Sequence, residues 1–250
     1  MNRTELQGGC FVTHCEQLES EQHERWSRAL VVGAKHGSRY LSQQLLQLNG
    51  GATPVWSAGV SDVVFFFLDG GGEIVISGRT FAVSADTAVH VKPGEAFSLR
   101  SDGGLRALIS ICPEVPLRVL DQMPDGFDEH WPERAVSTHA AAREETGERY
   151  FRLLLGKHNG SERVSLFVGH VPRSKAPEHY HLYEEALCVL SGEGRLWAGT
   201  SSATVGPGSL MFLPREQPHC LECTGAEGID VLGVFYPAGS PAVSYETGDP

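Results

Sequence analysis

The sequence has no long apolar run and no excess of basic residues, and these two absences exclude several classes of protein. No segment approaches the roughly 20 apolar residues of a membrane-spanning helix, and the opening MNRTELQGGC lacks an apolar core of signal-peptide length. Acidic residues outnumber basic ones by 31 to 20, which gives a formal net charge of −11. Nucleic acid or an anionic membrane would require clustered Lys and Arg, so we expect neither as a partner.

Cysteine is also scarce and irregularly spaced. The chain has 6 cysteines, at positions 10, 15, 112, 188, 220 and 223. They do not follow the dense spacing of a small disulfide-stabilised scaffold. Because no secretory signal is evident either, the pattern favours reduced thiols and a cytoplasmic location.

What the sequence does contain is glycine and proline between short β-forming segments. Its 250 residues include 29 glycines and 14 prolines, and 41% of them are hydrophobic. Runs such as DVVFFFLD and LRALISIC in the first half, and ALCVLSG and DVLGVFYP in the second, are typical of strands. Residues 153–171, LLLGKHNGSERVSLFVGHV, predict a hairpin with Asn159-Gly160 at its turn. We therefore predict an all-β fold.

An internal repeat predicts how these strands are divided. A shift of 122 residues places LDGGGEIVISG (68–78) on LSGEGRLWAG (190–199), and two further residues place LISICP (108–113) on LGVFYP (232–237). We predict two copies of one β unit, a first domain with a leading segment over 1–113 and a second over 151–250. Residues 114–150 then form a linker, within which AAAREETGERY (140–150) is expected to be helical.

A group of metal-ligating residues lies in the second copy. His179 and His181 are spaced to share one face of a strand, and Glu185 keeps the same parity. A following turn and strand bring His219 to the same region. Three imidazoles and a carboxylate suit one divalent transition metal, with Fe, Mn or Ni favoured and Cu or Zn as alternatives, and they leave coordination positions open. The competing interpretation is a chance cluster of strand histidines.

The same residues resemble the motifs of the cupin family. HYHLYEEALCVLSG (179–192) fills every fixed position of the first motif, H-x-H-x3-E-x6-G, and GPGSLMFLPREQPH (206–219) is similar to the second. The resemblance implies a double-stranded β-helix, or jelly-roll, barrel whose metal ligands are His179, His181, Glu185 and His219. With the repeat, the whole chain is similar to a bicupin. Cys223 replaces the usual closing Asn of the second motif, and we interpret it as a small buried hydrophobic residue.

The first copy does not have this ligand set. The 122-residue shift places Ser57, Gly59, Val63 and Phe97 at the ligand positions. Serine is a poor metal ligand and the other three offer no donor atom. We therefore expect the first barrel to be filled with hydrocarbon and to hold no metal.

The resemblance implies an enzyme without naming its reaction. We expect a metal-dependent enzyme that acts on a small organic metabolite, by oxygenase-type chemistry, with Glu185 as a catalytic base as the similarity to quercetinases suggests. The alternatives are a Lewis-acid isomerase, lyase or aminohydrolase, on the plan of ureidoglycine aminohydrolase, and a non-catalytic small-molecule-binding cupin. Exposed sheets make a homodimer the expected assembly. A substrate carboxylate could pair with one of four basic residues that are otherwise surface charges, namely Arg173, Lys175, Arg195 and Arg215.

Overall fold

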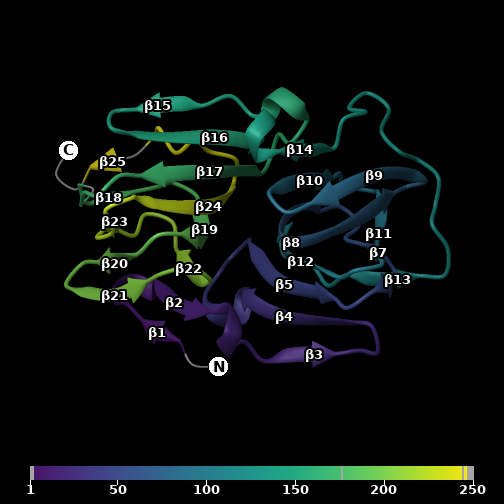
Figure 1. Cartoon of the computed structure of the whole chain (residues 1–250), viewed down its shortest axis with the longest axis horizontal. Helices are drawn as coiled ribbons and strands as arrows, with labels where there is room; N and C mark the ends of the chain where they lie inside the picture. The colour runs from purple at the N-terminus through teal and green to yellow at the C-terminus, as the bar shows by residue number, and fades with distance from the viewer. Residues whose placement is uncertain (1–2, 176, 244, 247–250) are drawn as a thin grey trace.

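The structure is a computed structural model that describes residues 3–175, 177–243 and 245–246. The described chain consists of β-strands, turns and single-turn 3-10 helices (Figure 1). No helix within these residues is long and apolar enough to cross a membrane. Strands of the first half, mostly blue, lie beside strands of the second half, mostly green and yellow. The predicted all-β fold of two barrels is confirmed.

The first barrel is built around one long, bent strand. This strand, β8, covers Asp62–Ile76 and pairs with β12 over its first part and with β11 over its second. Gly72 allows the close approach at the bend, since a Cβ there would lie 2.1 Å from the carbonyl oxygen of Arg100. The other strands of this barrel are β3 (Ser20–Gln22), β4 (Trp26–Val32), β5 (Ser42–Leu48), β6 (Gly51–Ala52), β7 (Val55–Ser57), β9 (Arg79–Ser84), β10 (Thr87–Val91), β11 (Ala96–Ser101), β12 (Leu105–Cys112), β13 (Arg118–Leu120) and β14 (Ala135–Ser137).

Aromatic side chains fill the interior of this barrel. Phe65 packs edge-to-face on Phe97 with ring centroids 5.1 Å apart, and Trp56 lies 5.9 Å from Phe97. Phe97 and Val63 are almost completely buried in the same cluster. The described residues contain no group of possible metal ligands in this half. The expectation of a hydrocarbon-filled first barrel therefore matches the packing.

The second barrel contains an eight-stranded sheet in the order β1-β2-β22-β19-β24-β17-β16-β15 and a smaller sheet β21-β20-β23. Its strands are β1 (Thr4–Glu5), β2 (Phe11–His14), β15 (Glu144–Thr146), β16 (Arg149–Leu155), β17 (Ser165–Val171), β18 (His179–Tyr180), β19 (Glu184–Ser191), β20 (Gly194–Ala198), β21 (Ser201–Val205), β22 (Ser209–Leu213), β23 (Cys220–Cys223), β24 (Ile229–Tyr236) and β25 (Tyr245–Glu246). The 3-10 helices of the chain are η1 (Gln7–Gly9), η2 (Cys15–Gln17), η3 (Ala34–His36), η4 (Thr138–Ala140) and η5 (Lys157–Asn159).

The leading segment of the chain contributes strands to this second sheet. Strand β2 pairs with β22 in an antiparallel register that sets Phe11 opposite Phe212, and their rings lie 5.6 Å apart. Residues 4–14 thus lie in the sheet of the second barrel. The boundaries at residues 113 and 151 stay predictions.

The prediction of a helix within residues 140–150 is wrong. This segment contains η4 only at its first residue and then forms a β-hairpin, in which Thr146 pairs with Arg149 across Gly147 and Glu148. Gly147 has φ of 64°, a left-handed conformation that favours glycine in a tight turn. Tyr150 and Phe151 then continue the strand against β17. Turn chemistry and strand-forming aromatics outweigh the helix propensity of the alanines. The predicted hairpin at 153–171 is confirmed, with Gly160 ending η5 in the left-handed conformation.

Two buried carboxylates at equivalent positions of the repeat join the barrels. Glu184 of the second barrel accepts a hydrogen bond from the Ser38 hydroxyl at 2.8 Å and from the backbone N–H groups of residues 39, 40 and 41. In the other direction, Asp62 of the first barrel accepts from Arg163 at 2.7 Å. Apolar residues from both halves pack in one core cluster around these contacts.

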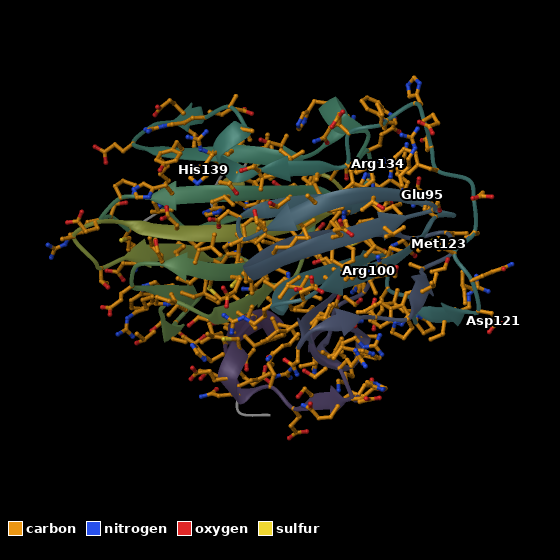
Figure 2. All side chains as sticks on the ribbon, turned by 45° about the vertical axis from the view of Figure 1, so that its right-hand side comes forward. Glu95, Arg100, Asp121, Met123, Arg134 and His139 are labelled. Carbon is orange, nitrogen blue, oxygen red and sulfur yellow. The ribbon has the colours of Figure 1, made fainter. Side chains whose placement is uncertain are left out.

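The predicted linker is fastened to the first barrel by a buried ion pair. Arg134 donates to both oxygens of Glu95, at 2.6 Å and 2.8 Å, and the two residues are only 1% and 3% exposed (Figure 2). Backbone N–H groups of Lys92 and Asp128 also donate to Glu95. Strands β13 and β14 extend the first barrel by pairing with β7 and β10. Residues 118–137 are therefore part of its structure.

Candidate metal centre

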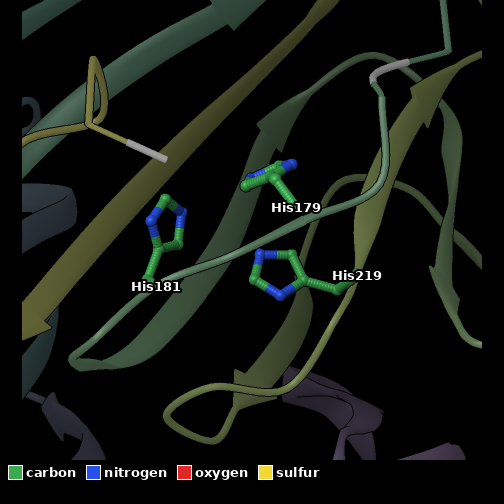
Figure 3. Close-up of side chains that lie close together, drawn as sticks. All are labelled: His179, His181 and His219. Atoms are coloured by element: carbon green, nitrogen blue, oxygen red, sulfur yellow. The ribbon is translucent and has the colours of Figure 1, made fainter. Parts of the chain in front are cut away.

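Three histidines from two separate parts of the second barrel lie together (Figure 3). His179 is in β18, and its backbone exchanges two hydrogen bonds with that of His219, which lies immediately before β23. The chain bends after β18, and His181 comes from this bend. One ring nitrogen from each histidine lies within 4.8 Å of the others. The structure thus brings these predicted ligands together, although their strand does not continue straight to Glu185.

In each of the three histidines, Nδ1 forms a hydrogen bond with a backbone carbonyl. The distance from Nδ1 to the carbonyl oxygen is 3.0 Å from His179 to Pro177, 3.0 Å from His181 to Val243 and 2.8 Å from His219 to Gln217. A carbonyl oxygen only accepts, so each Nδ1 carries a hydrogen, and Nε2 keeps its lone pair whenever the ring is neutral. Such contacts fix the tautomer and the ring orientation of metal-ligating histidines.

Glu185 adds a carboxylate to the same group. Its Oε2 lies 3.7 Å from Nε2 of His181 and 3.6 Å from Nε2 of His219. The side chain is buried, and Oε2 accepts no hydrogen bond from the described part of the chain. Buried polar atoms normally have partners, and a cation bound between Oε2 and the two imidazole nitrogens would supply the partner that Oε2 lacks. The donor set fits a divalent transition metal, and ligation by these four residues stays a prediction.

Burial also determines the protonation of the candidate ligands. Burial, with a smaller effect of the charge on His179, lowers the pKa of His181 to about 4 and that of His219 to about 3. Both rings are therefore neutral near pH 7, as metal binding requires. Burial has the opposite effect on an acid and raises the pKa of Glu185 to about 8.

These pKa values predict that Glu185 contributes about one released proton to metal uptake near pH 7. His181 and His219 have no proton to lose at this pH, whereas Glu185 lies below its pKa and must ionise to bind the cation. Isothermal titration calorimetry in buffers of different ionisation enthalpy measures the number of protons released. The Glu185→Gln variant should release about one proton fewer than the wild type, and an equal release from both proteins would contradict the assignment.

A cavity of about 240 Å³ opens beside the four residues. One part of its wall is apolar and is formed mainly by Phe151, Phe167, Leu187, Leu196, Leu213, Leu221, Val231 and Phe235. The polar residues of the wall are Thr146, Arg149, Tyr150 and His170. Ligand sites commonly combine such an apolar wall with a few polar groups, and the small volume limits the ligand to a small molecule.

Several residues considered from the sequence lie elsewhere. Cys223 is buried in the apolar core and does not line the cavity, in agreement with its interpretation as a small hydrophobic residue. None of the four basic residues considered for a substrate carboxylate lines the cavity either. Arg149, which does, begins a strand that the sequence suggested to be helical, so strand parity could not place it.

The segment after β24 covers part of the site. Pro241 and Ala242 line the cavity, and the Val243 carbonyl holds His181. Tyr183 stacks on His181 and donates its hydroxyl hydrogen to the carbonyls of Ser240 and Val243. The segment therefore orients a candidate ligand without itself providing one.

Truncation after Ser240 is expected to weaken metal binding 10- to 100-fold, the usual cost of losing a group that orients a ligand. The variant removes the carbonyl of Val243 and the pairing of β25 with β18. Competition with a chromophoric chelator gives the affinity. Truncation after Glu246 keeps both contacts and is the matched control. Equal affinities for the two truncated proteins would show that the segment does not support His181.

Comparisons with known proteins agree with this geometry. Residues 167–235 match the profile of the cupin domain. The solved structures that resemble the chain include variants of the oxalate decarboxylase of Bacillus subtilis. A Ser→Ala variant has a TM-score of 0.74 at 14% identity over 93% of this chain and 78% of that one, and a Trp→Phe variant has a TM-score of 0.73 at 13% identity over 90% and 76%. A search of curated protein sequences found no significant match.

The fold and the site define the class as an all-β protein of two jelly-roll barrels, with one candidate metal centre among its described residues. The chain contains a cupin domain, and its two barrels give it the bicupin fold.

Proposed function

We propose that this protein is a metal-dependent enzyme that converts a small organic metabolite by oxygenase-type chemistry. The observation that carries the proposal is the group of three histidine nitrogens within 4.8 Å of one another, with the buried carboxylate of Glu185 3.7 Å from His181 and 3.6 Å from His219, beside a small cavity. Four protein donors leave positions open on a six-coordinate ion, whereas structural sites are closed.

The metal that we favour is Fe, Mn or Ni. The oxalate decarboxylase that shares this fold has Mn(II) centres. When bound, such an ion would act as a Lewis acid toward the oxygen atoms of a chelating substrate. His179, His181, Glu185 and His219 would be its protein ligands.

The chain's own residues supply the remaining requirements of catalysis. Glu185 is the candidate base, because its buried carboxylate lies beside two candidate ligands and lines the cavity. The backbone carbonyls of Pro177, Val243 and Gln217 keep the imidazoles oriented while a proton moves. Apolar walls restrict water, which strengthens electrostatic interactions within the cavity.

The proposal is tested by oxygen consumption. Protein loaded separately with Fe(II), Mn(II) or Ni(II) is mixed with small enols, hydroxy acids and dicarboxylic acids, oxalate included, and products are followed by NMR. We expect turnover that consumes oxygen and stops under anaerobic conditions, and none in Glu185→Gln.

Two other outcomes would replace the proposal. Turnover that is indifferent to oxygen would identify a Lewis-acid lyase, isomerase or hydrolase, the second candidate, which the likeness in fold to a decarboxylase favours. Ligand-dependent thermal stabilisation without turnover would identify a binding protein.

A further inference from the structure

One guanidinium lines the cavity without an acidic partner. Arg149 is the only Arg or Lys among the described residues of the cavity wall. It is partly buried at the start of β16, and no described residue forms a hydrogen bond or ion pair with its side chain. Burial lowers the pKa of Arg149 from its usual value, which reflects lost hydration that no carboxylate compensates.

Other arginines nearby are satisfied within the protein. Arg143 pairs with Glu145 at 2.9 Å and lies over the ring of Tyr150. Arg152, on the same strand as Arg149, donates to the carbonyl of Ala141. The lack of a partner is therefore specific to Arg149 and is not shared by the other arginines of this hairpin.

The position of Arg149 connects it to the candidate metal centre. It shares the cavity wall with all four candidate ligands. The only acidic residue among the described residues of this wall is Glu185, which the metal would engage. A ligand in the cavity is thus the available source of an anion for Arg149.

We propose that Arg149 binds a carboxylate of the substrate, and that the substrate is a small carboxylic acid with a second oxygen-bearing group that reaches the metal centre. This inference rests on the proposed function and deepens it. A guanidinium binds a carboxylate through two parallel hydrogen bonds, which fixes orientation as well as charge. The volume of about 240 Å³ restricts the acid to a short chain.

The test uses dicarboxylates as probes and measures binding rather than turnover. Malonate, succinate and glutarate are titrated into Mn(II)-loaded protein by calorimetry, beside propionate, butyrate and valerate, which have the same lengths but one carboxylate. We expect the best dicarboxylate to bind about 10- to 100-fold more tightly than its monocarboxylate, since hydrogen bonds to charged groups are worth this much in a desolvated site. The best length reports the span between the metal centre and Arg149.

Three variants make the test specific. Arg149→Met should reduce the preference for the dicarboxylate over the monocarboxylate to less than about threefold. Arg149→Lys should keep part of this preference because the charge remains. Arg215→Met, which removes an exposed arginine outside the cavity wall, should keep all of it. Equal preferences in wild type and Arg149→Met would overturn the inference. Matching circular dichroism spectra and thermal midpoints verify that the variants are folded.

A failure of the proposed function is separable from a failure of this inference. Elemental analysis first establishes whether the protein retains metal. If it retains none, the same dicarboxylates are titrated into the metal-free proteins by NMR. Binding that Arg149→Met abolishes would keep the inference, and equal binding by all variants would overturn it.

Discussion

Replacing His219 with alanine is expected to remove the metal almost completely. The wild-type protein should hold about one equivalent of a divalent transition metal per chain, and His219→Ala close to none. His219 is in contact with every other member of the group, since its ring lies 4.7 Å from that of His179 and 5.4 Å from that of His181, and its Nε2 lies 3.6 Å from Oε2 of Glu185. Loss of a ligand should lower the metal affinity by more than the roughly 10- to 100-fold that follows loss of an orienting contact.

Elemental analysis of protein without a histidine tag measures this effect. His158→Ala is the matched control, because His158 is an exposed histidine in the hairpin turn η5. The control should keep its metal. Metal that persists in His219→Ala at the wild-type level would refute the proposed centre and place the binding site elsewhere.

Replacing Arg134 with methionine is expected to destabilise the first barrel by about 3–5 kcal/mol. The substitution leaves Glu95 buried with its charge unpaired, and it also removes three hydrogen bonds that the guanidinium donates to the carbonyls of His90, Asp128 and Trp131. Breaking a buried pair by removing one partner costs far more than the pair itself contributes, since desolvation of the remaining charge is no longer compensated. Urea unfolding followed by tryptophan fluorescence measures the change.

Three further proteins define the origin of this effect. Arg79→Met breaks an exposed pair with Glu129 in the same barrel and should cost no more than about 1 kcal/mol. The double variant Arg134→Met/Glu95→Gln removes the stranded charge and should recover part of the loss. Glu95→Gln alone completes the cycle, and a double variant that loses as much stability as Arg134→Met and Glu95→Gln lose together would show that the charges do not interact.

The candidate centre was largely predictable because its ligands follow local spacing. His179, His181 and Glu185 lie within seven residues of one another, and the two glycines after them predict the turn that returns the chain. His219 was predictable through a second motif of similar regularity. The repeat predicted the two barrels for the same reason, because it is visible in the order of residues along the chain.

Contacts between distant segments were not predictable in this way. Arg134 and Glu95 lie 39 positions apart and neither belongs to a motif, so nothing in the sequence pairs them. Glu184 stands beside a candidate ligand, yet its carboxylate binds the other barrel. Arg149 was missed because its strand was expected to be helical, which removed the alternation that assigns side chains to the two faces of a strand.

The pairing of β2 with β22 has a consequence for how the protein folds. During synthesis, residues 11–14 emerge long before residues 209–213, and the neighbouring bond from Gln7 to Ser201 spans 194 positions. The second barrel therefore cannot close until nearly the whole chain has left the ribosome, and Phe11 must stay unpaired meanwhile. Contacts of such high sequence separation slow folding and leave apolar strand edges exposed. Slow synthesis or low temperature should therefore favour soluble expression, and the metal centre should be the last part of the molecule to form.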